Sequence, residues 1–555
     1  MLDKQNIRLG LLSVIVVIAL LLYNSWQEER MLKKIDSTAT ASSVVDSKEK
    51  GAIDLPSAAR EEKEVVLVDP PALATIDPAR IVNVKTDVFN LKIDRLGGDL
   101  VYINLPKYPA ELGSSDGFVL LNEARDRFYV IQSGLLNELG PDSAASGRQL
   151  YSINQNDVVM DDGESILNVD MHFVTKTGVS ITKRFIFTRG SYDIRVHYII
   201  NNRSALEYSA SPFARIKRSA PIENNGGFFS AMRTYTGAAI NTPEKRYQKI
   251  SFADMQKKDL KENVVGGWAA MVEHYFASAI VPAVDEKNYF QTEDFGGDIF
   301  GITFVSAAKK IAPGMQETIE TKIYAGPEVA QKLKNVAPGL ELTIDYGWLW
   351  FLCQPIFWLL KTMYEVLGNW GLAIIATTII IKALFYKLSA SSYKSMGNMR
   401  KVQPKIEALK QRYGEDRQKF SQEMMALYRK EKVNPLGGCL PILIQIPVFI
   451  ALYYVLLESV ELRQAPFYLW IKDLSLKDPY YVLPIIMGLS MFVQQRLNPA
   501  PPDPMQAKVL MFMPLFFTFL FLQFPAGLVL YWVVNNLLSI LQQWMITRKI
   551  DAQAK

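Results

Sequence analysis

The sequence predicts a polytopic α-helical membrane protein with six transmembrane helices and a large all-β domain after the first of them. Long uncharged runs separated by basic loops indicate the helices, and short alternating apolar runs indicate the β domain. The charge distribution separates the same two parts. From Trp350 onward the chain has 22 Lys/Arg against 12 Asp/Glu, whereas the preceding 349 residues have 39 against 44. We therefore expect two structural parts of different chemistry within the 555 residues.

The apolar runs have the length of membrane spans. A helix needs about 20 mostly apolar residues to cross a bilayer. The stretch 509–547 has 39 uncharged residues, which is too long for one crossing, and Pro525-Ala526-Gly527 divides it into two helices joined by a tight turn. The other predicted spans are residues 9–26, 370–388, 433–457 and 479–495.

Two interpretations of the first apolar run compete. A cleaved signal peptide could end near Ala39-Thr40-Ala41. Five charged residues between 28 and 34 separate that site from the apolar run, so we favour an uncleaved signal anchor, residues 1–26.

The basic loops predict the orientation. Residues 387–432 hold 12 Lys/Arg and 5 Asp/Glu, whereas the loop 461–478 holds three of each. Because basic loops stay in the cytoplasm, we expect residues 387–432 and both termini on that side, including a short tail, 548–555. The roughly 320 residues between the first two spans must then lie outside.

The outside part divides into three segments. Residues 27–80 are polar and read as a flexible tether. Residues 81–340 show alternating runs such as Val179–Phe187 and Tyr192–Ile200, which predict an antiparallel β-sandwich. Residues 341–367 combine tryptophans with charged residues, which favours an amphipathic helix at the membrane interface.

The composition argues against several classes of enzyme. Two cysteines and three scattered histidines cannot form a disulfide framework or a recognisable metal site. No nucleotide-binding or nucleophile motif occurs in a convincing context. We expect no enzyme activity, no catalytic residue, no cofactor, no metal and no nucleic-acid specificity. Acid–base catalysis by acids of the β domain is the weaker alternative.

Lys382 is the first candidate functional residue. A charge inside a span costs about 2.5–3.5 kcal/mol on insertion scales, so it indicates a functional site. Thr378 lies four residues earlier, on the same helical face. The alternative is that Lys382 snorkels, because Lys387 and the cytoplasmic end are only about 8 Å away.

Other polar residues lie inside the spans. They could be hydrogen-bonded contacts between helices, or they could line a wet groove together with Lys382. These residues are Gln445, Thr518, Gln523, Asn535 and Asn536.

The basic loop 389–432 has helical periodicity on both sides of Tyr413-Gly414-Glu415, which predicts an antiparallel helical hairpin. Flexible methionines suit the capture of varied apolar segments, and the candidates are Met396, Met399, Met424 and Met425. A hairpin core attracted to anionic lipid explains the pattern equally well.

A channel or transporter is the alternative function, and the absence of an acidic partner for Lys382 within the spans counts against it.

Several motifs make the sequence recognisable. These are Glu431-Lys432-Val433-Asn434-Pro435-Leu436-Gly437-Gly438-Cys439, Ser459-Val460-Glu461-Leu462-Arg463, Asp478-Pro479-Tyr480-Tyr481 and Phe524-Pro525-Ala526-Gly527-Leu528. In this order they resemble the YidC family of membrane protein insertases, of the Gram-negative type.

The resemblance implies a chaperone-like insertase of the inner membrane. Its five-helix core, residues 368–547 with the hairpin 389–432, would form a hydrophilic groove open to cytoplasm and lipid, beneath a periplasmic β-supersandwich. Lys382 stands where the family typically has Arg, and Lys keeps the charge but loses the planar donor set. The implied groove residues are Lys382, Thr378, Gln445, Thr518, Tyr531 and Asn535.

The resemblance also implies partners. Nascent integral membrane proteins would be the substrates, alone or together with the Sec translocon (SecYEG and SecDF), within the lipid bilayer. Ribosome contact would be weak, because only Arg548, Lys549 and Lys555 carry positive charge after the last span.

Overall fold

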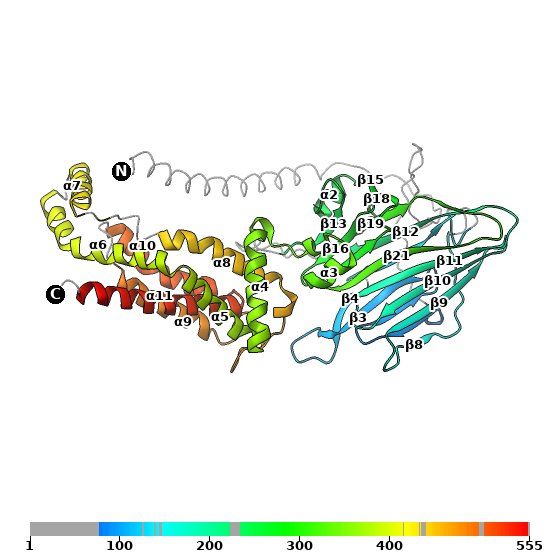
Figure 1. Cartoon of the computed structure of the whole chain (residues 1–555), viewed down its shortest axis with the longest axis horizontal. Helices are drawn as coiled ribbons and strands as arrows, with labels where there is room; N and C mark the ends of the chain where they lie inside the picture. Colours follow the sequence, from blue (N-terminus) through cyan, green and yellow to red (C-terminus); the bar gives the residue numbers. More distant parts are fainter. Residues whose placement is uncertain are drawn as a thin grey trace, which may run out of the picture. The chain divides into compact units, whose positions relative to one another are not determined.

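The computed structural model describes residues 77–552, apart from 125–126, 138–139, 144–146, 222–233, 414–415, 432, 434–439 and 499–503. The predicted signal anchor and nearly all of the predicted tether lie outside the described residues. From there on the described chain consists of a β-rich part followed by a helical part (Figure 1).

The β-rich part contains two sheets. The first has the order β15-β18-β19-β12-β5-β3-β2-β1-β8, with β4, β6, β7 and β20 beside it. Its strands are β1 (Ile81–Lys85), β2 (Asn90–Asp94), β3 (Asp99–Pro109), β4 (Gly117–Leu121), β5 (Tyr129–Leu136), β6 (Asp142–Ser143), β7 (Gly147–Arg148), β8 (Asp157–Val159), β12 (Tyr208–Ser219), β15 (Lys261–Val265), β18 (Lys287–Asp294), β19 (Ile299–Ser306) and β20 (Lys309–Ile311).

The second sheet has the order β14-β13-β16-β17-β21-β11-β10-β9, and all its described pairings are antiparallel. Its strands are β9 (Ile166–Val174), β10 (Val179–Thr188), β11 (Asp193–Asn202), β13 (Gly237–Asn241), β14 (Gln248–Ile250), β16 (Trp268–Glu273), β17 (Phe276–Val281) and β21 (Gln316–Pro327). The short helices α2 (Phe252–Lys257) and α3 (Ala330–Val336) accompany the strands.

Strand alternation explains how the sheets enclose a core. Along β11 every second side chain is buried, among them Ile194, Val196 and Tyr198. Successive side chains of a strand point to opposite faces, so this pattern buries one face and leaves the other partly open. The predicted β-rich architecture is confirmed.

The β-rich part also buries a charged cluster. Lys183 is fully buried, and Arg148 lies beside the carboxylates of Asp99 and Asp142. Burial raises the pKa of the Asp99 carboxyl, although the Arg148 guanidinium opposes that shift. The ammonium of Lys183 donates to the carbonyl oxygens of Gly97, Gly98 and Ser133 at 2.9, 2.8 and 2.7 Å. These partners satisfy all three donors of the ammonium. Because Ser133 belongs to β5 of the first sheet, the cluster joins β10 to that sheet.

The helical part begins with α4 (Trp350–Leu367), which follows the predicted amphipathic pattern. Its buried side chains are Cys353, Ile356 and Leu360, whereas Trp350 and Trp358 are exposed. The remaining helices are α5 (Trp370–Leu384), α6 (Tyr386–Tyr413), α7 (Arg417–Lys430), α8 (Leu440–Glu458), α9 (Val482–Leu497), α10 (Pro504–Phe521) and α11 (Ala526–Ala552).

Within the described residues, no helix taken singly combines the length and apolar character of a membrane span. Helices α5 and α6 meet that standard only as a pair, and they are bent by 67° relative to each other. Residues 445–458, 482–497 and 508–521 form shorter apolar helices. The predicted division of the last apolar stretch is confirmed, because α10 ends at Phe521 and α11 begins at Ala526.

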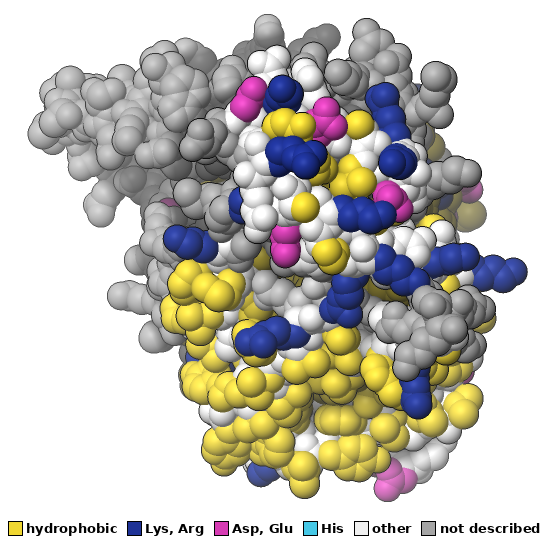
Figure 2. Space-filling view, turned by 90° about the vertical axis from the view of Figure 1, so that its left-hand side faces the viewer, with side chains coloured by type: hydrophobic (Ala, Val, Ile, Leu, Met, Phe, Trp, Pro, Cys, Tyr) yellow, Lys and Arg dark blue, Asp and Glu magenta, His cyan; other side chains and the backbone are white. Residues whose placement is uncertain are grey.

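The predicted hairpin consists of α6 and α7. Its small core contains Val402, Ile406, Tyr428 and Val433, and Lys405 pairs with Glu431 at 2.7 Å between Nζ and Oε1. Figure 2 shows Lys and Arg side chains gathered over the upper part of the view and hydrophobic side chains over the lower part. The basic and apolar surfaces therefore adjoin on this face of the molecule.

Candidate functional site

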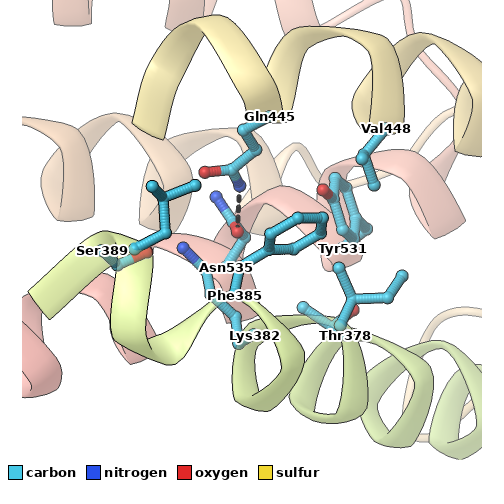
Figure 3. A pocket seen from close by; sticks show the side chains of 10 residues that line it. Thr378, Lys382, Phe385, Ser389, Gln445, Val448, Tyr531 and Asn535 are labelled. Carbon is cyan, nitrogen blue, oxygen red and sulfur yellow. Dashed lines mark hydrogen bonds between the residues drawn. The ribbon is translucent and has the colours of Figure 1, made fainter. Parts of the chain in front are cut away.

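The candidate site is a pair of cavities among α5, α6 and α8–α11. The smaller, of about 30 Å³, is lined by Thr378, Ile381, Lys382, Phe385, Leu388, Ser389, Gln445, Val448, Tyr531 and Asn535. That volume holds one or two water molecules. Figure 3 shows these side chains converging from α5, α6, α8 and α11. Five of the six predicted groove residues therefore lie together.

Helix α5 positions the first two of these residues. Asn369 begins the helix by accepting a hydrogen bond from the Leu372 amide at 3.0 Å, as N-cap side chains do. About two and a half turns later, the Thr378 hydroxyl donates to the Ile374 carbonyl at 2.6 Å. Because Lys382 follows Thr378 by four residues, both face the cavity.

The Lys382 ammonium points toward α11. Its Nζ donates to the hydroxyl of Ser539 at 2.7 Å, and this direction favours the cavity interpretation over snorkelling. Among the residues that the structure describes, no carboxylate forms an ion pair with Lys382. Lys382 is half-buried, and a cation partly removed from water without a counterion is costly, so this site favours water or a transient anionic group.

An amide pair spans the cavity. The Gln445 side-chain amide on α8 donates to the Asn535 side-chain carbonyl on α11 (Figure 3). Tyr531, one turn before Asn535 and almost fully buried, stacks near Phe449 with ring centroids 6.3 Å apart. These contacts connect α8 to α11 on one side of Lys382.

The larger cavity has a volume of about 420 Å³. It shares Gln445 and Asn535 with the smaller one. Its further lining combines amide, hydroxyl and apolar side chains: Tyr393, Met396, Ile446, Phe449, Met491, Gln494, Gln495, Asn498, Leu510, Met513, Pro514, Phe517, Trp532, Asn536 and Ser539. A mixed lining of this kind can hold both polar and apolar groups.

Thr518 is the predicted groove residue that lines neither of these two cavities. Its hydroxyl donates to the Pro514 carbonyl at 2.7 Å, and the side chain packs against Gly488 of α9. The periodicity of a uniformly apolar helix does not indicate which face meets its neighbour, so the sequence could not place Thr518.

The four methionines predicted to capture substrates lie in two different environments. Met396 lines the larger cavity. Met399, Met424 and Met425 are partly buried against the core of the hairpin. Their packing agrees with the hairpin-core alternative.

Sequence reasoning identified Asn535 and Asn536 but missed the other members of a polar stripe on α11. Asn535, Asn536, Ser539, Gln542 and Gln543 are all buried. Their spacing of one, four, seven and eight residues from the first places them on one helical face. They reach four neighbouring helices, with contacts to Gln445, Ser490, Lys382, the Tyr386 carbonyl and the Leu497 carbonyl. The signal was present in the sequence as this spacing within an uncharged run.

Comparison with known proteins defines the class. Residues 362–553 match the family model described as 60Kd inner membrane protein, and residues 81–359 match the model described as YidC periplasmic domain. The chain is thus an inner-membrane protein with a periplasmic domain.

Relatives of similar length define the family. The chain is 49% identical to the membrane protein insertase YidC of Pseudomonas putida strain GB-1 over 98% of each chain. It is 53% identical to that of Pseudomonas fluorescens strain SBW25 over 85% of this chain and 84% of the relative. The chain therefore belongs to the YidC family.

Solved structures resemble it more distantly. An active YidC insertase with its first transmembrane domain resolved matches with a TM-score of 0.38 and 17% identity, over 83% of this chain and 93% of that one. A galactose mutarotase-like protein from Lactobacillus casei matches with a TM-score of 0.29 and 9% identity, over 44% of this chain and 99% of that one.

Proposed function

We propose that this chain is a membrane protein insertase that inserts integral inner-membrane proteins and helps them fold. The observation that carries the proposal is its 49% identity, over 98% of both chains, to a relative named membrane protein insertase YidC. The chain would cross the membrane six times, with both termini in the cytoplasm and residues 81–340 in the periplasm.

The mechanism begins at the hairpin. Basic side chains on α6 and α7 attract anionic lipid, and Met396 presents a flexible apolar surface at the edge of the larger cavity. An emerging apolar segment meets this region first. Its attached polar tail then reaches the cavities.

The polar tail occupies the space around Lys382, Thr378, Gln445 and Asn535. Exposed peptide groups in hydrocarbon cost several kcal/mol each, and the amides and hydroxyls of the cavities offer replacement hydrogen bonds. The positive charge of Lys382 attracts acidic groups. These interactions shorten the hydrocarbon path and lower the kinetic barrier.

Partition of the apolar segment supplies the driving force. It leaves between α8 and α10 into lipid, gaining a few tenths of a kcal/mol per residue over about 20 residues. No nucleotide is needed for short tails. The chain would act alone on such substrates or beside the Sec translocon on larger ones.

Cross-linking to a stalled nascent protein tests this path. A photoreactive side chain placed at Met396 or Gln445 should link to the polar tail of a single-span substrate. Leu541 is the matched control, because it lies on α11 but is half exposed and lines neither cavity described above. Equal linkage from Leu541 and Gln445 would contradict the path.

A further inference from the structure

Ser539 occupies a special place on the polar stripe of α11. It is 3% exposed, and its hydroxyl oxygen accepts a hydrogen bond from the Lys382 ammonium at 2.7 Å. The same hydroxyl donates to the Asn535 carbonyl, also at 2.7 Å. Because a serine hydroxyl has one proton and two lone pairs, donation to the backbone leaves a lone pair for Lys382.

This contact determines where the charge of Lys382 is held. The lysine stem is flexible and tends to carry its charge toward water. Lys387 lies only five residues further along the chain, beyond the bend between α5 and α6. Without a partner on α11, the ammonium could therefore reach the cytoplasmic end instead of the cavity.

The contact between Lys382 and Ser539 lies at the boundary of the two cavities. Lys382 lines the smaller cavity and Ser539 the larger. The amide pair Gln445–Asn535 belongs to both linings. One of the three ammonium donors is bonded to Ser539, and among the described residues no other group accepts from Nζ. The remaining donors are thus available to an entering group.

We infer that Ser539 is a positioning residue for insertion, which holds the Lys382 ammonium at the boundary between the two cavities so that it attracts acidic groups of a translocating tail. This inference rests on the proposed insertase function and extends it to a residue beyond the predicted groove set.

The test uses the full chain in liposomes and two single-span substrates whose translocated tails are equally long, one acidic and one neutral. Thr and Val have nearly the same shape and differ in the hydroxyl, so Ser539→Thr and Ser539→Val form a matched pair. We expect Ser539→Val to lower the ratio of acidic-tail to neutral-tail insertion by about fivefold, the size of one typical net hydrogen bond. Ser539→Thr should retain the ratio.

The same substitutions in a chain that carries Lys382→Met distinguish a positioning role of Ser539 from a purely structural one. In a chain that already carries Lys382→Met, adding Ser539→Val should not change the ratio of acidic-tail to neutral-tail insertion any further. Such non-additivity shows that the two residues act as a pair. If Ser539→Val does not fold, Ser539→Ala removes the same oxygen without adding bulk.

The inference is overturned if Ser539→Val and Ser539→Ala lower insertion of both substrates equally, or if their effect on the ratio persists with Lys382→Met. Wild-type chain that inserts neither substrate above empty liposomes would instead refute the proposed function. The two failures are therefore distinguishable.

Discussion

At the scale of single residues, the proposed mechanism depends on a cation placed among amides and hydroxyls. In this mechanism Lys382 supplies the positive charge, and its contact with Ser539 directs the ammonium toward α11. Its planar counterpart Arg would bring a fork of donors to the same place. A point charge is sufficient if the cavity attracts acidic groups and water without fixed bidentate geometry.

Substitution of Lys382 tests this view. Lys382→Arg should retain insertion of both acidic and neutral tails, because the charge is kept. Lys382→Glu should impair acidic tails most, by about tenfold relative to neutral tails, since one reversed charge in a poorly screened site costs at least 1.4 kcal/mol. Protease protection of tails in liposomes measures both. Loss of activity in Lys382→Arg, or an equal effect of Lys382→Glu on neutral tails, would contradict the electrostatic account.

The sequence could reveal part of this site. Lys382, Gln445 and Asn535 stand out because polar groups are costly in apolar runs. Ser539 taken by itself does not stand out in the sequence, because a serine within a helix commonly bonds to the backbone of its own helix, as Ser539 also does. Its second contact depends on how α5 packs against α11, which no local pattern encodes.

At the scale of helices, close packing keeps the cavity walls in place. Gly488 on α9 meets Thr518 on α10, and an ideal Cβ at Gly488 would lie 1.9 Å from the Thr518 hydroxyl oxygen. The predicted helices could be placed from hydropathy. The bend of 67° after α5 could not, because neither Pro nor Gly occurs at Leu384–Tyr386 and the bend follows from packing.

This contact gives a compensating pair of substitutions. Gly488→Ala should lower stability by about 1–3 kcal/mol, as overpacking does. Thr518→Ala in the same chain should recover most of that loss, because it removes the clashing hydroxyl. Thermal unfolding of the detergent-solubilised chain measures the effect. A double variant no more stable than Gly488→Ala would show that the two helices do not pack as described.

At the scale of the whole molecule, the two cavities of the candidate site belong to the helical part alone. Every lining residue comes from α5, α6 or α8–α11, except Phe385, which lies between α5 and α6, and Asn498, which follows α9. The β-rich part has its own sheets and its own buried charged cluster. Alternation in the sequence predicted this part, whereas the pairing order of its strands depends on long-range contacts that alternation does not contain.

Deletion of residues 81–335 should therefore leave insertion of short-tailed substrates largely intact, within about twofold of the full chain. The matched control is the same deletion combined with Lys382→Glu, which should again discriminate against acidic tails. Loss of insertion by a deleted chain that still folds would favour a function carried by the β-rich part, such as carbohydrate binding.

The most direct test of the insertase function is reconstitution. The purified full chain is placed in liposomes of pure lipid, and a single-span protein with a short acidic tail is added. We expect the tail to be protected from protease above the level in empty liposomes. No protection by a chain shown to be folded would contradict autonomous insertion and would favour a transporter or a function that requires the Sec translocon.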